Sequence, residues 1–101
     1  MADLSVYYID GKHDVMVITI DNAEVIRLDI KGLCGDKTET VDETILKATM
    51  MAMEQLYKNC SRDDIDIDEF VKSIVIPYLS YAIRPLKRRS AGMRRLRSPY
   101  M

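Results

Sequence analysis

The sequence predicts an α+β fold in which a three-stranded antiparallel meander is followed by two helices and a basic C-terminal arm. Residues 4–31 hold three short runs rich in β-branched and aromatic residues, separated by the Gly, Asp and Asn that reverse a chain. From residue 41 onward the apolar residues recur instead at helical spacing. A chain of 101 residues has room for one domain, and its hydrophobic content of 48% is enough to form one core.

The three strands are expected at about 4–10, 15–21 and 24–31. The middle run, VMVITID, is almost wholly apolar, as expected for a central strand covered on both faces. In the third run, EVIRLDIK, charged and aliphatic side chains alternate, which predicts one exposed face. Asn22 and Ala23 fit a two-residue connection between the last two strands, although Ala suits positive φ less well than Gly. The exit loop is GLCGDK.

The first helix is predicted at about 41–59. Thr40 and Glu43 form a capping box at its start, since each side chain can bond the backbone N–H of the other residue. One apolar line recurs at helical spacing through Ile45, Thr49, Ala52, Met53 and Leu56. A second apolar line follows beside it through Leu46, Met50, Met53 and Tyr57. The combined width predicts that this helix lies under another helix as well as on the sheet.

The second helix is predicted at about 66–82, with a kink at Pro77. Asp64, Asp66 and Asp68 are successive N-cap candidates, and the apolar residues after them follow helical spacing. A strand through SIVIPYLSYAI is the alternative, because β-branched residues precede the proline and Pro can occupy an edge strand.

Charge divides the chain into an acidic domain, residues 1–83, and a basic arm, residues 84–101. The first part holds eight Lys or Arg against sixteen Asp or Glu, a net charge of -8, and the second holds seven basic residues and no acid, a net of +7. The basic residues of the arm are Arg84, Lys87, Arg88, Arg89, Arg94, Arg95 and Arg97. Such asymmetry indicates the chemistry of a partner rather than a fold.

The charge of the arm predicts that the protein is a non-enzymatic accessory protein. Its arm is expected to bind the phosphate backbone of RNA or DNA with little sequence specificity. Arg outnumbers Lys six to one in the arm, which favours bidentate contacts, and Tyr100 could stack on a base. Gly92 divides the basic residues into two clusters and disfavours one rigid helix through both. The alternative partner of the arm is an acidic protein surface. The protein would then be an assembly subunit whose arm binds an acidic neighbouring subunit, which can be a second copy of the same chain in a homo-oligomer.

A second alternative is enzymatic. A strand ending YYIDG, two further antiparallel strands, a helix with Glu43 near its start and the acids Asp64, Asp66 and Asp68 resemble the first half of a ribonuclease H-like domain. The resemblance covers roughly residues 4–70. It implies that Asp10, Glu43 and Asp66 or Asp68 hold two Mg²⁺ ions that activate a water.

The sequence lacks the residue patterns of other kinds of functional site. Cys34 and Cys60 have no CxxC spacing and His13 is the single histidine, so neither a metal site nor a cofactor is expected. The motifs of nucleotide cradles, zinc hydrolases and serine hydrolases are missing from the sequence. His13 is expected in a solvated turn. With no secretory signal pattern and no apolar run of membrane-span length, an intracellular location without membrane contact is expected.

Overall fold

The structure, a computed structural model, describes residues 3–9, 11, 13–60 and 64–96, with side-chain surroundings in the last range as far as residue 88. The strands β1 (Leu4–Ile9), β2 (Val15–Ile20) and β3 (Ala23–Asp29) form one antiparallel sheet in the order β1-β2-β3. The predicted meander is confirmed. As expected, the apolar middle run forms the central strand.

The β2–β3 hairpin turns one residue earlier than predicted. Asp21 and Asn22 occupy the turn with φ of 54° and 68°, and Ala23 already pairs with Ile20. A two-residue turn of this kind needs positive φ at both central positions, which Asp and Asn tolerate and Ala does not. A register shift between Ile18 and Thr19 follows in the same pair of strands.

β3 ends two residues before the predicted boundary. Asp29 becomes the N-cap of a short helix, α1 (Ile30–Leu33), and its Oδ1 accepts the Gly32 N–H at 3.0 Å. The predicted alternation still holds as far as residue 31, because residues 26, 28 and 30 are buried while residues 27, 29 and 31 are exposed.

The first long helix is α2 (Val41–Asn59), which has the predicted boundaries. Its capping box is present: the Glu43 N–H donates to Thr40 Oγ1 at 3.1 Å and the Thr40 N–H donates to Glu43 Oε1 at 2.8 Å. An inner stripe of α2 is buried: Ile45, Ala48, Thr49, Ala52 and Leu56. The polar side chains of Gln55 and Asn59 bond the outer backbone edge of β3.

α2 packs against another helix as well as the sheet, as predicted, since it contacts both α4 (Ile76–Leu96) and β3. Its second apolar line, however, is not the face that they cover. This outer stripe consists of Leu46, Met50, Met53 and Tyr57, of which only Met53 is partly buried. The chain returns as a single helical segment, and that segment packs beside the inner stripe. In the part of the molecule that the structure describes, no further helix lies over the outer stripe.

The predicted second helix is present and longer than expected. Its helical segment comprises α3 (Ile67–Phe70) with Asp66 as N-cap, a π-helical turn η1 (Val71–Val75), and α4 (Ile76–Leu96). In the π turn the Ile76 N–H donates to the Val71 carbonyl, directly before Pro77, whose ring disfavours regular α-helical bonding. α4 continues past the predicted end at 82 and through Gly92, so one helix carries the basic residues on both sides of that glycine as far as Arg95.

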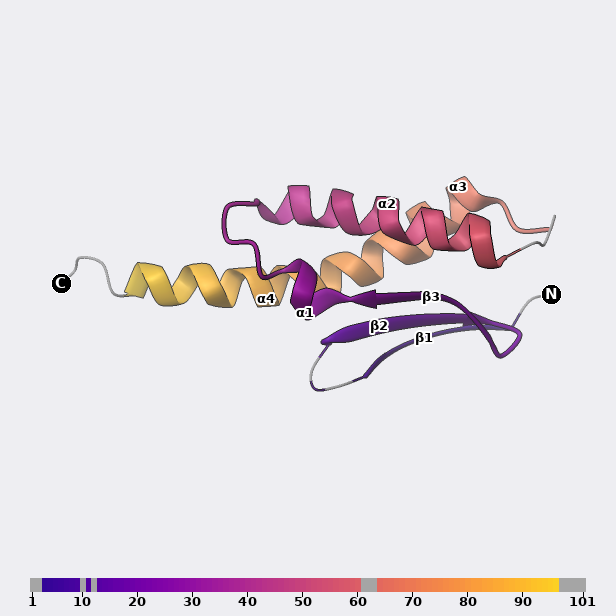
Figure 1. Cartoon of the computed structure of the whole chain (residues 1–101), viewed down its shortest axis with the longest axis horizontal. Helices are drawn as coiled ribbons and strands as arrows, with labels where there is room; N and C mark the ends of the chain where they lie inside the picture. Colours follow the sequence, from indigo (N-terminus) through magenta and orange to yellow (C-terminus); the bar gives the residue numbers. More distant parts are fainter. Residues whose placement is uncertain (1–2, 10, 12, 61–63, 97–101) are drawn as a thin grey trace.

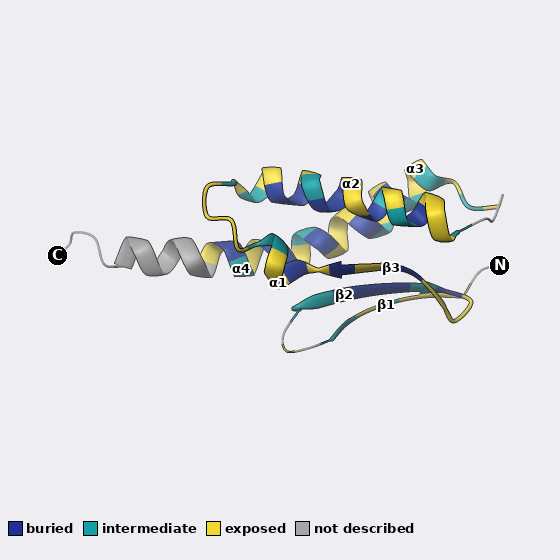
Figure 2. Cartoon of the chain, in the orientation of Figure 1, coloured by how far each residue is buried: buried dark blue, intermediate teal, exposed yellow. Residues whose placement is uncertain are grey.

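The helices cover one face of the sheet (Figure 1). The buried sides of the strands and of the helices face one another (Figure 2) and form one core. Its largest fully buried side chains include Met16, Ile18, Ile26, Leu28, Leu56, Leu79 and Ile83. The basic end of α4 extends beyond the sheet, at the opposite end of the molecule from α3 (Figure 1). Within the described ranges, no helix combines the length and apolar character that crossing a membrane requires.

Candidate nucleic-acid interface

α4 carries six of the seven predicted basic residues, all except Arg97, and two of them are exposed where side chains are described. Arg84 donates from Nε to Ser80 Oγ at 2.7 Å, and its Nη2 lies 3.6 Å from Asp42 Oδ1 at the start of α2. Arg88 lies one turn further along and is also exposed. Both guanidinium groups are therefore available to a phosphate, since an ion pair as open as that of Arg84 is weak.

Lys87 has a different role from its neighbours. Its side chain is 8% exposed, and its Nζ donates to the backbone carbonyls of Asp36 at 2.6 Å and Glu39 at 2.9 Å. The ammonium group thus fastens α4 to the loop before α2 and cannot reach a phosphate from this position. The sequence held a signal for this: Lys87 lies four residues after Ile83 and eight after Leu79, both buried.

The remaining predicted residues stay predictions. Arg89, Arg94 and Arg95 belong to the backbone of α4, without described side-chain surroundings. Arg97 and Tyr100 lie outside the described residues. The predicted boundary between domain and arm at residue 83 falls inside α4, and Lys87 belongs to the packed part of the molecule.

An aromatic cluster stands beside these arginines, and sequence reasoning missed it. The His13 ring meets Tyr8 edge-on at 4.6 Å and Tyr81 edge-on at 5.0 Å between ring centroids. Tyr8 donates its hydroxyl to the Tyr78 carbonyl at 2.7 Å, which ties β1 to α4. His13 does lie in the predicted turn, with φ of 63°, and its ring packs between two tyrosines.

Burial raises the pKa of Tyr8 to about 12, and the neighbouring Tyr78 and Tyr81 hydroxyls add to the shift. Tyr8 therefore remains protonated as a donor at neutral pH. Tyr81, by contrast, is 62% exposed, and with Pro77 and Tyr78 it lines a shallow apolar pocket of about 210 Å³. The cluster thus holds one exposed ring in a fixed place.

Tyr81, Arg84 and Arg88 lie on one face of α4, because their spacing of i, i+3 and i+7 spans two helical turns. All three are exposed. The period of the helix also places the backbone of position 95 in line with positions 84 and 88. An exposed aromatic ring beside exposed guanidinium groups offers the two kinds of contact that single strands use, stacking on a base and binding of phosphates.

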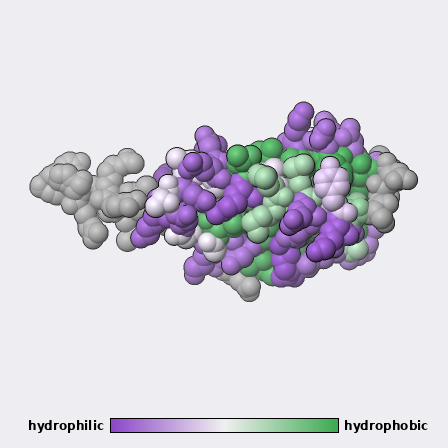
Figure 3. Space-filling view, turned by 45° about the horizontal axis from the view of Figure 1, so that its top comes forward, coloured by the Kyte–Doolittle hydropathy of each residue, from purple (hydrophilic) through white to green (hydrophobic). Residues whose placement is uncertain are grey.

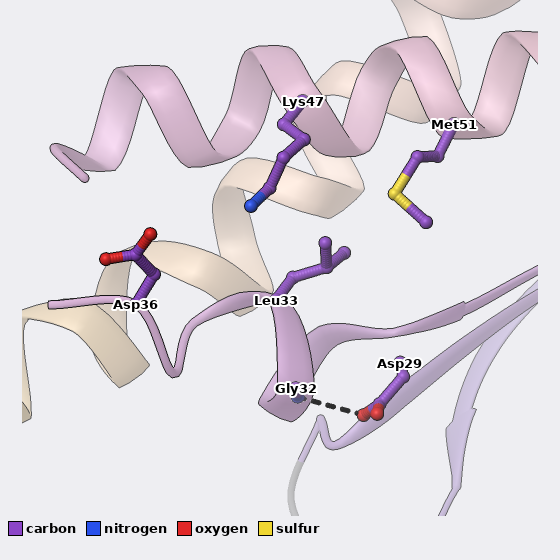
Figure 4. Close-up of a pocket in the computed structure, with 6 residues that line it drawn as sticks. All are labelled: Asp29, Gly32, Leu33, Asp36, Lys47 and Met51. Carbon is purple, nitrogen blue, oxygen red and sulfur yellow. Dashed lines mark hydrogen bonds between the residues drawn. The ribbon is translucent and has the colours of Figure 1, made fainter. Parts of the chain in front are cut away.

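A second pocket, of about 280 Å³, opens between α2 and α1 (Figure 4). Asp29 bonds the Gly32 N–H, Asp36 accepts from both the N–H and the hydroxyl of Thr38, and Lys47 Nζ donates to Glu39 Oε2 at 2.8 Å. The bonds from Thr38 hold the pKa of Asp36 below its usual range, and the Glu39 bond raises the pKa of Lys47. The charged groups that line this pocket are therefore already hydrogen-bonded within the chain.

The acids of the ribonuclease H-like resemblance are far apart where the structure describes them. Glu43 lies in the first turn of α2, whereas Asp66 caps α3 beyond the other end of that helix (Figure 1). Nineteen residues of α-helix span about 28 Å, far more than one metal site. Asp10 lies outside the described residues. Among the described side chains no group of three or more metal-ligating residues comes together.

Cys34 is half-buried, and burial raises its thiol pKa although Lys87 nearby opposes the shift. A raised pKa lowers the fraction of reactive thiolate. Comparisons with protein-family models, with curated proteins and with solved structures find no match for this chain.

Proposed function

We propose that this protein is a non-enzymatic accessory protein that binds nucleic acid, preferentially single strands, through the exposed face of α4. The observation that carries the proposal is the row of Tyr81, Arg84 and Arg88 on one side of the helix. The further arginines of the arm extend this row in sequence, toward the end with a net charge of +7. Phosphates bind the arginines and a base stacks on Tyr81, with little sequence readout.

The charge of the rest of the molecule supports this arrangement. Residues 1–83 carry a net charge of -8 and repel a polyanion. A nucleic acid is therefore held at the basic end of α4, which extends away from the sheet (Figure 1). Binding of this kind depends on counterion release and weakens as salt rises.

The arginines are tested by fluorescence anisotropy with a labelled oligonucleotide, single- or double-stranded, over a salt series. For Arg84→Ala with Arg88→Ala we expect weaker binding and a log affinity against log salt slope that is flatter by about 1.4 units on a single strand. Lys58→Ala, an exposed cation of α2, is the matched control and leaves the slope unchanged. Equal slopes in all three proteins would contradict the proposed interface.

Tyr81 is tested separately, because stacking depends on an aromatic ring rather than on charge. Tyr81→Leu should weaken single-strand binding about tenfold and leave the salt slope unchanged, while Tyr81→Phe binds as the natural chain does. Tyr7→Leu, an exposed tyrosine of β1, is the control. Cleavage of the oligonucleotide in Mg²⁺, lost in Glu43→Gln, would replace this proposal with the nuclease alternative.

The second candidate function is an assembly subunit whose basic arm binds the acidic end of a neighbouring copy. It is favoured by the position of the exposed acids Asp66, Asp68 and Glu69 at α3, at the opposite end of the molecule from the basic end of α4 (Figure 1). Such head-to-tail contacts join copies into open chains. Light scattering distinguishes this candidate: long oligomers at low salt that dissociate at high salt, without nucleic acid, would support it.

A further inference from the structure

The outer stripe of α2 exposes large apolar side chains in a continuous row. Leu46 is 61% exposed, Met50 63% and Tyr57 65%, and the half-buried Met53 lies between them. Hydrophobic surface gathers in the middle of the face that carries α2, with hydrophilic groups around it (Figure 3). Single exposed apolar residues are common on protein surfaces, whereas a contiguous row of large ones on one helix indicates an interaction surface.

The spacing of the row indicates the kind of partner. Its four members are separated by four, three and four residues, which is the repeat by which two helices pack side chains along a shared seam. The seam covers most of a helix of 19 residues, about 28 Å long. The stripe therefore fits another helix lying along α2.

The charges beside the seam indicate which helix. Along one flank α2 carries Glu43, Lys47, Glu54 and Lys58, so acidic and basic residues alternate. If a second α2 lies antiparallel, the reversed order places Glu43 opposite Lys58 and Lys47 opposite Glu54, so every pair has opposite signs. In a parallel pair this flank would instead face the opposite flank of the partner helix, so these complementary pairs would not form.

We infer that the outer stripe is a dimer interface in which α2 packs antiparallel against α2 of a second copy of this chain. Around a two-fold axis, Leu46 packs on Tyr57 of the other copy and Met50 on Met53, twice each. Lys47 is bonded to Glu39 within its own chain, and its side chain is still 43% exposed, so its ammonium can also meet Glu54 of the other copy.

The size of the surface sets the expected strength. A single helix pair of this length gives an interface near the lower end of specific ones, on the order of 1,000 Å². The protein should therefore pass reversibly between monomer and dimer as its concentration changes.

The test is sedimentation velocity of the full chain over a concentration series, without nucleic acid. We expect the natural chain to shift from monomer to dimer, and Met50→Lys, at the centre of the seam, to remain monomeric at every concentration. Met51→Lys is the matched control, since Met51 is also exposed but faces the pocket beside Lys47. Far-ultraviolet circular dichroism checks that both variants fold.

The antiparallel direction is tested by charge. Glu54→Lys places a lysine opposite Lys47 of the other copy, twice in each dimer, and should weaken the dimer about tenfold. A mixture of Glu54→Lys and Lys47→Glu chains should form heterodimers that restore complementarity. This dimer persists at high salt because apolar packing holds it, unlike the arm-to-acid assembly. The inference is overturned by a natural chain that stays monomeric, by equal effects of Met50→Lys and Met51→Lys, or by an unchanged dimer in Glu54→Lys.

Discussion

The inner and outer stripes of α2 have similar apolar content and opposite surroundings. Ala48, Ala52 and Leu56 of the inner stripe are fully buried, whereas Leu46 and Met50 of the outer stripe each expose more than half of their surface. Both stripes repeat at helical spacing in the sequence. The difference teaches that periodicity locates the apolar faces of a helix without indicating whether its own chain covers them. Which face is covered depends on where the following element packs. Here a single helical segment follows α2, and it covers the inner stripe alone.

Substitutions in the two stripes should have very different effects on folding, and this is the largest effect that we expect. Leu56→Ala leaves a cavity in a closed core and should lower the free energy of unfolding by about 2–5 kcal/mol. Leu46→Ala removes a side chain that is 61% exposed and should cost the monomer less than about 0.5 kcal/mol. Urea unfolding followed by circular dichroism measures both.

Dimerisation adds a concentration dependence that separates the stripes further. Unfolding of the natural chain should require more urea at high protein concentration, because a dimer of folded chains stabilises them by mass action. Leu46→Ala should reduce that dependence, while Leu56→Ala retains it. Similar losses of stability in dilute Leu46→Ala and Leu56→Ala protein would show that the outer stripe is covered within the chain.

A second contrast concerns how α2 is held at its start. Lys87→Met removes the two hydrogen bonds to the Asp36 and Glu39 carbonyls but keeps the apolar stem, and should cost about 1–3 kcal/mol of unfolding free energy. Arg88→Met, at the exposed neighbour, is the control and should cost less than about 0.5 kcal/mol. Equal effects at both positions would mean that the loop does not depend on Lys87.

Local signals in the sequence predict the fold well. The first hairpin turn follows from Gly11, and Asn22 places the second within one residue. The start of α2 follows from the capping box of Thr40 and Glu43, because these features act within four residues of one another. The helix at α4 follows from apolar periodicity. Each of these predictions needed only short-range geometry.

The sequence predicts the candidate site less well, because its parts come together over long separations. The His13 ring meets Tyr81 only after β1, β2 and the helices have packed, and the carbonyls that hold Lys87 come from a loop 48 or more residues earlier. Charge counting treats Lys87 and Arg88 alike, whereas packing buries the first and exposes the second. Composition therefore predicts a basic region without identifying which of its members can reach a ligand.

A third face of α2 is polar and protects the edge of the sheet. Gln55 accepts the Arg27 N–H at 2.8 Å and donates to the Arg27 carbonyl at 2.9 Å, so one amide replaces a missing strand. Gln55→Ala should cost about 0.5–1.5 kcal/mol and speed hydrogen exchange of the Arg27 amide. Glu54→Ala, the neighbouring exposed residue, should leave that exchange rate unchanged. Unaltered exchange in Gln55→Ala would show that water satisfies this edge equally well.

The smallest expected effect concerns the opposite edge, where Tyr8 ties β1 to α4. Tyr8→Phe removes the bond to the Tyr78 carbonyl and should cost about 0.5–1 kcal/mol at neutral pH. Because folding raises the pKa of Tyr8 from 10.0 to about 12, its contribution is complete below pH 10 and is lost as the pH rises toward 12. The stability difference between the natural chain and Tyr8→Phe should therefore shrink across that interval in urea titrations.

Tyr7→Phe, at the exposed neighbouring tyrosine, is the control. A difference that stays constant up to pH 12 would show that Tyr8 ionises as freely in the folded chain as in the unfolded one.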